Sequence, residues 1–346
     1  MRAIFYDKYN TPPVIEELPD PDLSPNGVII RVLAAGLCLS DWHGWRGHDP
    51  DIRLPHVPGH EFAGVIVDAG SRVKKWKEGV RVTVPFIQAC GRCKYCLRGD
   101  NQVCSNQFQA GFTHWGAFAE LVSVQRADFN LIELPETMSY EEAAVLGCRF
   151  GTAYRAVCDQ GKVRPGSWVA IFGCGGVGLS AVAIAHAKNA RVIAIDLDET
   201  ALDQAVNLGA EVAIRWLPEI SVAEEIQRIS GGGVQVSLDA FGSPEIISEA
   251  IHCLDRRGKH IQIGLMGESG GVASIQMSRV IAMELEMIGS HGIQAFRYPD
   301  MFDLIRDNNI PLKQMIAKTV SLEEALPFFS LPVPEMNRGI SVINKF

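Results

Sequence analysis

The chain contains 346 residues, of which 47% are hydrophobic and 21% are charged, and its formal net charge is −8. The length exceeds that of one average domain and predicts two, while the composition is that of a folded globular protein. The negative charge argues against a nucleic-acid partner, and neither a basic leader nor an apolar run of membrane-spanning length is found, so we expect a cytosolic protein with no membrane partner.

Short β-branched segments dominate the first part of the sequence. They predict strands at residues 28–34, 64–67 and 80–84, and the segments 116–120 and 131–135 continue the pattern. Because glycine, aspartate and lysine turns separate strands at this spacing, a small β-rich barrel is expected.

Several metal-binding residue types lie between the first two predicted strands. Cys38, Asp41, His60 and Glu61 offer a thiolate, an imidazole and two carboxylates, a mixture that suits zinc. A catalytic zinc takes three protein ligands and keeps one position open, and Cys148 is the candidate for the remaining ligand. Taken singly, each cysteine is as well explained as a small buried hydrophobe, and His60 as a core histidine. The combination favours a metal site.

Four further cysteines, Cys90, Cys93, Cys96 and Cys104, follow one another closely. Four thiolates on one short lobe can close a tetrahedron around a zinc ion with no open position, which makes such a site structural. Disulfides are a poor alternative in a cytosolic chain, whereas an iron–sulfur cluster is a real competitor at this spacing.

A helix is predicted to present Cys148. Ser139, with Glu142 three residues later, has the pattern of a capping box at a helix N-terminus. We expect this helix to run into Cys148 and beyond it.

A different pattern begins near residue 165. A strand at 168–172 leads into a glycine-rich turn, a helix follows at about 179–189, and a second strand at 191–195 ends at Asp196. This order is the fingerprint of a dinucleotide-binding unit. The residues assigned to the cofactor are Gly173, Gly175, Gly176, Val177, Gly178 and Asp196.

The glycines allow the backbone to approach a pyrophosphate, whose charge lies at the N-terminus of the helix. Asp196 is expected to accept hydrogen bonds from the ribose hydroxyls, which favours NAD over NADP, and residues 197–199 offer no Arg or Lys for a 2′-phosphate. The alternative is that Asp196 only caps the following helix.

Strands and helices continue to alternate as far as residue 289. The predicted strands are 211–214, 234–238, 259–263 and 285–288, and the predicted helices are about 199–208, 222–229 and 244–254. Six parallel strands with crossover helices make a doubly wound sheet, so the fold class is α/β with a second, β-rich part. A helix near 298–308 and a strand near 339–343 complete the chain.

Over essentially its whole length, the order of these motifs resembles that of the zinc-containing medium-chain alcohol dehydrogenases, of the medium-chain dehydrogenase/reductase superfamily. The resemblance implies a GroES-like catalytic domain over residues 1–150, with a structural zinc lobe at about 88–106. It also implies a Rossmann NAD-binding domain over 151–289, and a segment over 290–346 that returns to the catalytic domain. The active site would then lie in the cleft between the two domains.

The resemblance also assigns the metals. It implies two zinc ions per chain, one structural on the four-cysteine lobe and one catalytic on Cys38, His60 and Cys148. Glu61 matches a carboxylate that lies behind the catalytic metal and joins its coordination in some relatives.

The same resemblance gives roles to the residues around Cys38. Ser40 would receive the alcohol proton and His43 would pass it to solvent by way of the cofactor ribose. Asp41 is expected to orient His60 for a different reason, because metal-bound histidines usually require such a partner. Leu39 departs from several relatives, which carry Arg or His there for the pyrophosphate, so the cofactor would be held more weakly or released faster.

The function implied is an NAD-dependent zinc alcohol dehydrogenase that interconverts a primary or secondary alcohol with an aldehyde or ketone. A polyol or amino-alcohol dehydrogenase of the same superfamily is the alternative, because it shares the architecture and the catalytic zinc. A non-catalytic relative is disfavoured, since the ligands and the proton path are all present. A homo-oligomer, either a dimer or a tetramer, is expected.

Overall fold

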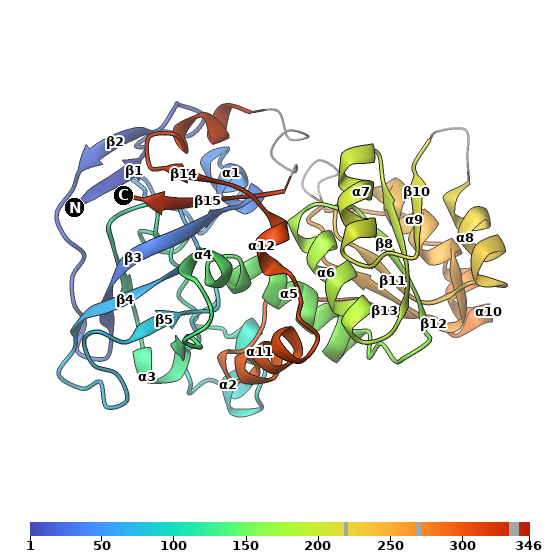
Figure 1. The fold of residues 1–346 in the computed structure, drawn as a ribbon, viewed down its shortest axis with the longest axis horizontal. Helices are drawn as coiled ribbons and strands as arrows, with labels where there is room; N and C mark the ends of the chain where they lie inside the picture. The colour runs from blue at the N-terminus through green and yellow to red at the C-terminus, as the bar shows by residue number, and fades with distance from the viewer. Residues whose placement is uncertain (218–220, 267–270, 332–338) are drawn as a thin grey trace. The chain divides into compact units, whose positions relative to one another are not determined.

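The computed structural model describes residues 1–217, 221–266, 271–331 and 339–346. The chain divides into two compact units (Figure 1). The first comprises Met1–Gly151, Gly292–Pro299 and Leu312–Phe346, and the second comprises Thr152–His291 and Asp300–Pro311. No helix within these described ranges has the length and hydropathy needed to span a membrane.

Seven strands of the first unit form one mixed sheet, in the order β14-β15-β3-β4-β5-β7 with β6 beside β3. Their bounds are Val28–Leu37 (β3), Glu61–Ala69 (β4), Arg81–Thr83 (β5), Leu121–Val124 (β6), Ile132–Glu133 (β7), Ile316–Ser321 (β14) and Ile340–Lys345 (β15). The strands expected at 28–34 and 64–67 are therefore confirmed as parts of β3 and β4, and the strand expected at 80–84 is the shorter β5. Two strands that were not predicted, Arg2–Phe5 (β1) and Val14–Glu17 (β2), form a separate antiparallel pair.

The segment 116–120 is not a strand, contrary to the prediction. Its amides bond to an irregular loop instead: the N–H of Gly116 donates to Val57, that of Ala117 to Gly59 and that of Phe118 to Pro58. The regular strand β6 starts only at Leu121, where pairing with β3 begins. This departure from the sheet supports the loop that leads to His60.

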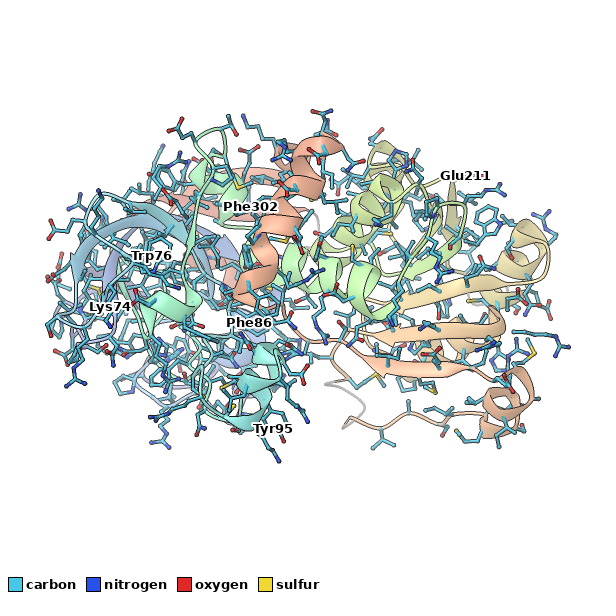
Figure 2. The ribbon with its side chains drawn as sticks, turned by 90° about the horizontal axis from the view of Figure 1, so that it is seen from below. Lys74, Trp76, Phe86, Tyr95, Glu211 and Phe302 are labelled. Atoms are coloured by element: carbon cyan, nitrogen blue, oxygen red, sulfur yellow. The ribbon has the colours of Figure 1, made fainter. Side chains whose placement is uncertain are left out.

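Short helices connect the strands of the first unit. They are Leu39–Trp45 (α1), Lys94–Leu97 (α2), Asn101–Val103 (η1), Ala127–Asn130 (α3), Tyr140–Ala143 (α4), Leu146–Phe150 (η2), Ala295–Arg297 (η4), Leu312–Met315 (α12) and Leu326–Ser330 (η5). The loop between β4 and β5 is fastened to α3, because Trp76 Nε1 donates to the Ala127 carbonyl at 3.1 Å and the Lys74 N–H to Asp128 Oδ2 at 2.9 Å (Figure 2).

The helix expected to start at Ser139 begins as predicted but does not run on unbroken. Ser139 and Glu142 form the capping box, with Ser139 Oγ accepting the Glu142 N–H. The α-helical ladder ends at Ala143, and a π-helical turn (η2) carries Cys148. The reason is that the N–H groups of Cys148 and its successor donate to a carboxylate of β4 rather than to carbonyls one turn back.

The second unit contains a six-stranded, all-parallel sheet in the order β10-β9-β8-β11-β12-β13, as expected for a doubly wound fold. Its strands are Trp168–Phe172 (β8), Arg191–Asp196 (β9), Val212–Arg215 (β10), Val234–Asp239 (β11), Leu254–Gln262 (β12) and Glu286–Gly289 (β13). Central strand β8 is fully buried along its length, which explains its continuous apolar sequence.

Helices cross between these strands. They are Gly151–Tyr154 (α5) and Arg155–Gln160 (η3) before β8, then Gly176–Ala187 (α6), Glu199–Asn207 (α7), Val222–Ser230 (α8), Pro244–His252 (α9) and Met277–Met283 (α10). The helices predicted from sequence are confirmed, although α6 begins three residues earlier than expected and α10 was not foreseen.

The end of the chain contributes to both units. Strand β15 pairs antiparallel with β3, with Ser341 opposite Leu37, so this part completes the first sheet. Helix Tyr298–Asp307 (α11) starts in the first unit, where the Tyr298 hydroxyl lies 3.4 Å from the Leu146 carbonyl. Residues 300–311, expected with the C-terminal segment, belong instead to the second unit, where Met301 and Ile305 form a buried stripe at helical spacing.

Candidate functional site

The site begins where β3 ends and α1 starts. Cys38 is the N-cap of α1, and Asp41 in the first turn accepts the Cys38 N–H through Oδ2 at 3.1 Å. Asp41 is only 1% exposed, so its carboxylate needs partners inside the protein. The pattern Cys-x-Ser-Asp therefore fixes the direction of the Cys38 side chain through a local cap.

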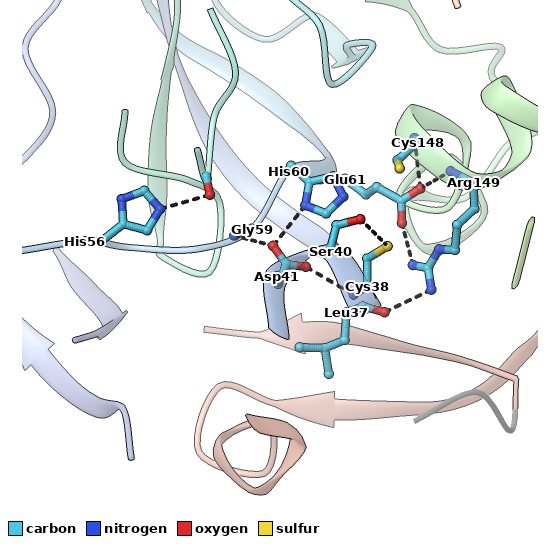
Figure 3. Close-up of polar contacts among 11 residues, drawn as sticks. Leu37, Cys38, Ser40, Asp41, His56, Gly59, His60, Glu61, Cys148 and Arg149 are labelled. Atoms are coloured by element: carbon cyan, nitrogen blue, oxygen red, sulfur yellow. Dashed lines mark hydrogen bonds and ion pairs between the residues drawn. The ribbon is translucent and has the colours of Figure 1, made fainter. Parts of the chain in front are cut away.

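The other oxygen of Asp41 reaches the loop before β4. Oδ1 lies 2.9 Å from His60 Nδ1 and accepts the Gly59 N–H at 3.0 Å (Figure 3). Gly59 has φ +105, and a Cβ there would lie 2.5 Å from the Phe118 backbone nitrogen, so a side chain is excluded. His60 Nε2 is buried and has no hydrogen-bond partner. Histidine binds a metal through one ring nitrogen while the other is held by a hydrogen bond, and His60 has this arrangement.

The ligand atoms of Cys38, His60 and Cys148 all lie within 4.8 Å of one another. The structure thus brings together Cys38 at the start of α1, His60 in the loop before β4 and Cys148 in η2. The Cys148 thiol, assisted by the Arg149 guanidinium and His60, holds the pKa of Cys38 well below its usual range against the cost of burial. Two thiolates and one imidazole fit a zinc ion, and they leave room for one further ligand.

Glu61 lies beside this group but is not a member of it. Its Oε1 accepts the N–H groups of Cys148 at 2.8 Å and Arg149 at 2.7 Å, and its Oε2 forms an ion pair with Arg149 Nη2 (Figure 3). Burial raises the pKa of Glu61, and the Arg149 charge opposes that rise. In this structure, the Glu61 carboxylate therefore binds the Arg149 guanidinium and two backbone N–H groups of η2.

Arg149 is a site residue that the sequence reasoning missed. Its side chain is buried, although arginine is rarely buried without a partner. The available signal was an arginine placed directly after a candidate ligand within an otherwise apolar segment.

Ser40 and His43 lie on α1. Ser40 Oγ is 3.7 Å from Cys38 Sγ, which places the hydroxyl beside the three ligands. His43 Nδ1 lies 3.0 Å from His48 Nδ1, and the ring of Trp42 packs edge-on against both histidines. His48 is exposed and had been given no role from the sequence.

The four lobe cysteines form a second group whose sulfur atoms lie within 4.8 Å of one another. The Sγ atom of Cys93 lies 3.5 Å from that of Cys96 and 3.8 Å from that of Cys104. Four sulfurs bound to zinc at about 2.3 Å stand about 3.8 Å apart, so this spacing fits a tetrahedral zinc. Backbone N–H groups point at the sulfurs, and Tyr95 lies on the lobe's surface between Lys94 and Arg98 (Figure 2).

The glycine-rich turn of the second unit joins β8 to α6. Gly173 has φ +90, and Gly175 is the N-cap of α6 with no side chain to cover the free N–H groups of the first turn. A Cβ on Gly178 would lie 1.7 Å from the Gly173 carbonyl oxygen, so helix and turn pack directly against one another. The open N-terminus of this 12-residue helix suits a phosphate group.

Asp196 ends β9 beside this turn. Its Oδ2 accepts the Cys174 N–H at 2.6 Å, and its Oδ1 accepts the Asp198 N–H at 2.9 Å. The alternative that Asp196 caps the next helix is wrong, because the N-cap of α7 is Asp198, which accepts the Thr200 N–H. Asp196 is half-buried and directed at the turn, as a residue near a bound nucleotide would be.

A basic residue does lie near Asp196, although none is found among the next three residues of the sequence. Arg215 on β10 is in register with Asp196 on β9. Its Nη1 forms an ion pair of 2.6 Å with Glu199 Oε1, so the charge of the Arg215 guanidinium is already paired with a carboxylate. Sequence reasoning missed Arg215 because strand pairing, and not sequence proximity, places it there.

Comparisons with known proteins identify the family of the chain. The profile "Alcohol dehydrogenase GroES-like domain" matches residues 24–136, and "Zinc-binding dehydrogenase" matches residues 176–307. An NAD-dependent alcohol dehydrogenase of Sulfurisphaera tokodaii is 32% identical over 94% of both chains. A sorbitol dehydrogenase of Bacillus subtilis is 34% identical over 90% of this chain and 87% of its own. The solved alcohol dehydrogenase of Aeropyrum pernix superposes with a TM-score of 0.89 at 28% identity, over 99% of this chain and 100% of its own. The chain therefore belongs to the zinc-containing medium-chain alcohol dehydrogenase family.

Proposed function

We propose that the protein is an NAD-dependent zinc alcohol dehydrogenase that oxidises a primary or secondary alcohol to an aldehyde or ketone, and catalyses the reverse reduction. The observation that carries this proposal is the convergence of Cys38, His60 and Cys148, with the buried His60 Nε2 left without a partner. A relative that had lost its chemistry would have no reason to keep this set of ligands.

Cys38, His60 and Cys148 would hold the catalytic zinc, and Asp41 would keep His60 in the tautomer whose Nε2 faces the metal. When bound, zinc lowers the pKa of an alcohol hydroxyl and so favours loss of its proton. The remaining work of the protein is to remove that proton and to position the hydride acceptor.

Ser40 is placed to accept the proton, because its hydroxyl lies beside Cys38. His43 would transfer the proton outward, and its contact with exposed His48 gives the path a histidine at the surface. Such general acid–base assistance typically contributes about a hundredfold to ten-thousandfold in rate.

The second unit would hold NAD, which accepts the hydride. Gly173, Gly175, Gly176, Val177 and Gly178 would surround the pyrophosphate with backbone N–H groups, and Asp196 would bind the ribose hydroxyls. Asp196 gives this corner a negative charge, because the nearby Arg215 is already paired with Glu199, and that charge disfavours the 2′-phosphate of NADP.

A second zinc per chain would occupy Cys90, Cys93, Cys96 and Cys104 and stabilise the lobe. Because all four positions of that zinc would be filled by thiolates, its role is structural. The nine cysteines include no disulfide, which supports a reducing compartment and hence a cytoplasmic protein.

A homo-oligomer, dimer or tetramer, is also proposed. Edge strand β13 bears Met287, which is 37% exposed, and neighbouring α10 exposes Ile281 at 73%. Apolar side chains beside a sheet edge support association with a second copy. Light scattering tests the state, and a monomer at micromolar concentration would contradict it.

A polyol dehydrogenase is the second candidate, favoured by the similarity to the sorbitol dehydrogenase over 90% of the chain. A panel of primary, secondary and aromatic alcohols together with polyols, each assayed with NAD, decides between the two. Cys148→Ser should abolish turnover of whichever substrate is accepted, while Cys158→Ser, which lies outside both cysteine groups, should not. Turnover that survives in Cys148→Ser would contradict the proposal.

A further inference from the structure

One guanidinium group connects the neighbours of all three proposed zinc ligands. Arg149 follows Cys148 in the chain, its Nη2 forms an ion pair with Glu61, which follows His60, and its Nη1 donates to the carbonyl of Leu37, which precedes Cys38, at 2.9 Å (Figure 3). The Arg149 and Glu61 side chains are 7% and 0% exposed, so water does not replace these contacts.

The backbone leaves room for this arrangement at one point. A Cβ on Gly36 would lie 2.7 Å from Arg149 Nη2 and 3.2 Å from Glu61 Oε2. Any side chain at this position of β3 would therefore press on the ion pair. Because Gly36 has no side chain, the Arg149 guanidinium can pack directly against the backbone of β3.

The ion pair between Arg149 and Glu61 affects the charge around the proposed catalytic metal. Four groups here carry negative charge when ionised: Cys38, Asp41 and Glu61, which are buried, and Cys148, which is half-buried. Arg149 and a divalent metal would be the cations beside them. Without Arg149, the Glu61 carboxylate would be a buried charge whose nearest available cation is the metal. Zinc also accepts carboxylate oxygen as a ligand, and its fourth coordination position would be open to Glu61.

We infer that Arg149 is a positioning residue that withholds Glu61 from the catalytic metal and so keeps the fourth position for substrate. The inference rests on the proposed catalytic zinc. Both carboxylate oxygens are already engaged, Oε1 by two backbone N–H groups of η2 and Oε2 by the guanidinium. The same contacts fix the segment that carries Cys148.

The test uses cobalt(II) in place of zinc, because its d–d absorption bands respond to a change of ligand. Arg149→Met removes the charge but keeps most of the side-chain volume, Arg149→Lys keeps the charge, and the double variant Arg149→Met with Glu61→Gln removes both charges. Difference spectra against the wild-type protein cancel the contribution of the four-cysteine site, which all forms share.

Arg149→Met should shift the d–d bands, because Glu61 becomes a ligand, whereas Arg149→Lys and the double variant should show the wild-type bands. Unchanged bands in Arg149→Met would overturn the inference. Shifted bands in the double variant would overturn it as well, since they would mean that Glu61 already binds the metal in the wild type, and this outcome can be observed even if Arg149→Met fails to fold. If wild-type protein bound no cobalt at Cys38, His60 and Cys148, the proposed function would fall together with this inference.

Discussion

His60 Nδ1 lies 2.9 Å from Asp41 Oδ1, and the same carboxylate accepts the backbone N–H groups of Cys38 and Gly59. A single buried aspartate thus orients one proposed ligand through its ring and another through its backbone. The free Nε2 of His60 is a consequence, because the bond to Asp41 fixes which nitrogen remains.

Asp41→Asn should weaken metal binding at this site by about ten- to a hundredfold, because an amide nitrogen cannot accept the bonds that one carboxylate oxygen accepts now. Competition with a chromophoric chelator measures the affinity. Asp51→Asn, at an exposed position, is the matched control and should leave the affinity unchanged. Identical competition curves for Asp41→Asn and wild type would refute the role of Asp41.

Ser40→Ala should reduce the rate of alcohol oxidation by about a hundredfold to ten-thousandfold with metal content preserved, because the proton loses its first acceptor. His43→Gln should have a smaller effect and be partly rescued by added buffer base, since solvent can replace an outer proton carrier. Steady-state rates measured as a function of pH test both variants. A pH–rate profile that is unaltered in His43→Gln would count against this proton path.

The regular part of the fold was predictable because local sequence determines it. The strands of the second unit are buried on both faces and appear as apolar runs such as Trp168–Phe172, while the glycine-rich turn and Asp196 follow at fixed spacing. The short strands β2 and β14 were missed because their residues are largely half-buried or exposed, so no clear apolar run marks them.

Non-local contacts were not predictable from one sequence. The break in the helix before Cys148 arises because Glu61, far away in the chain, captures two of its amides. Arg215 lies opposite Asp196 only because of the register of β9 and β10. The ligand residues were identifiable because zinc restricts residue types, whereas Arg149 belongs to no such restricted set.

Gly178→Ala should weaken NADH binding and destabilise the protein by about 1–3 kcal/mol, because its Cβ would overlap the Gly173 carbonyl oxygen and push α6 off the turn. Fluorescence titration with NADH and thermal unfolding measure the two effects. Gly289→Ala is the control, since a Cβ there meets nothing within 4 Å. Equal NADH affinity in Gly178→Ala and Gly289→Ala would show that the turn does not hold the cofactor.

NAD should be preferred to NADP by a factor on the order of a hundred or more in kcat/KM. A 2′-phosphate about 4 Å from the Asp196 carboxylate would be repelled by about 4 kcal/mol at an effective dielectric constant of 20. Asp196→Ser combined with Leu197→Arg should shift the preference toward NADP, and Leu197→Arg alone is the control. Equal kcat/KM values for the two cofactors in the wild type, or a higher value with NADP, would overturn the assignment of Asp196.

The central claim is that Cys38, His60 and Cys148 bind a zinc ion separate from that of the four-cysteine lobe. Metal analysis of freshly purified wild-type and His60→Ala protein, with folding checked by circular dichroism, tests it most directly. The account predicts two zinc ions per wild-type chain and one per His60→Ala chain, with turnover lost only in the variant. Equal zinc content in the two proteins, or normal turnover in His60→Ala, would contradict it.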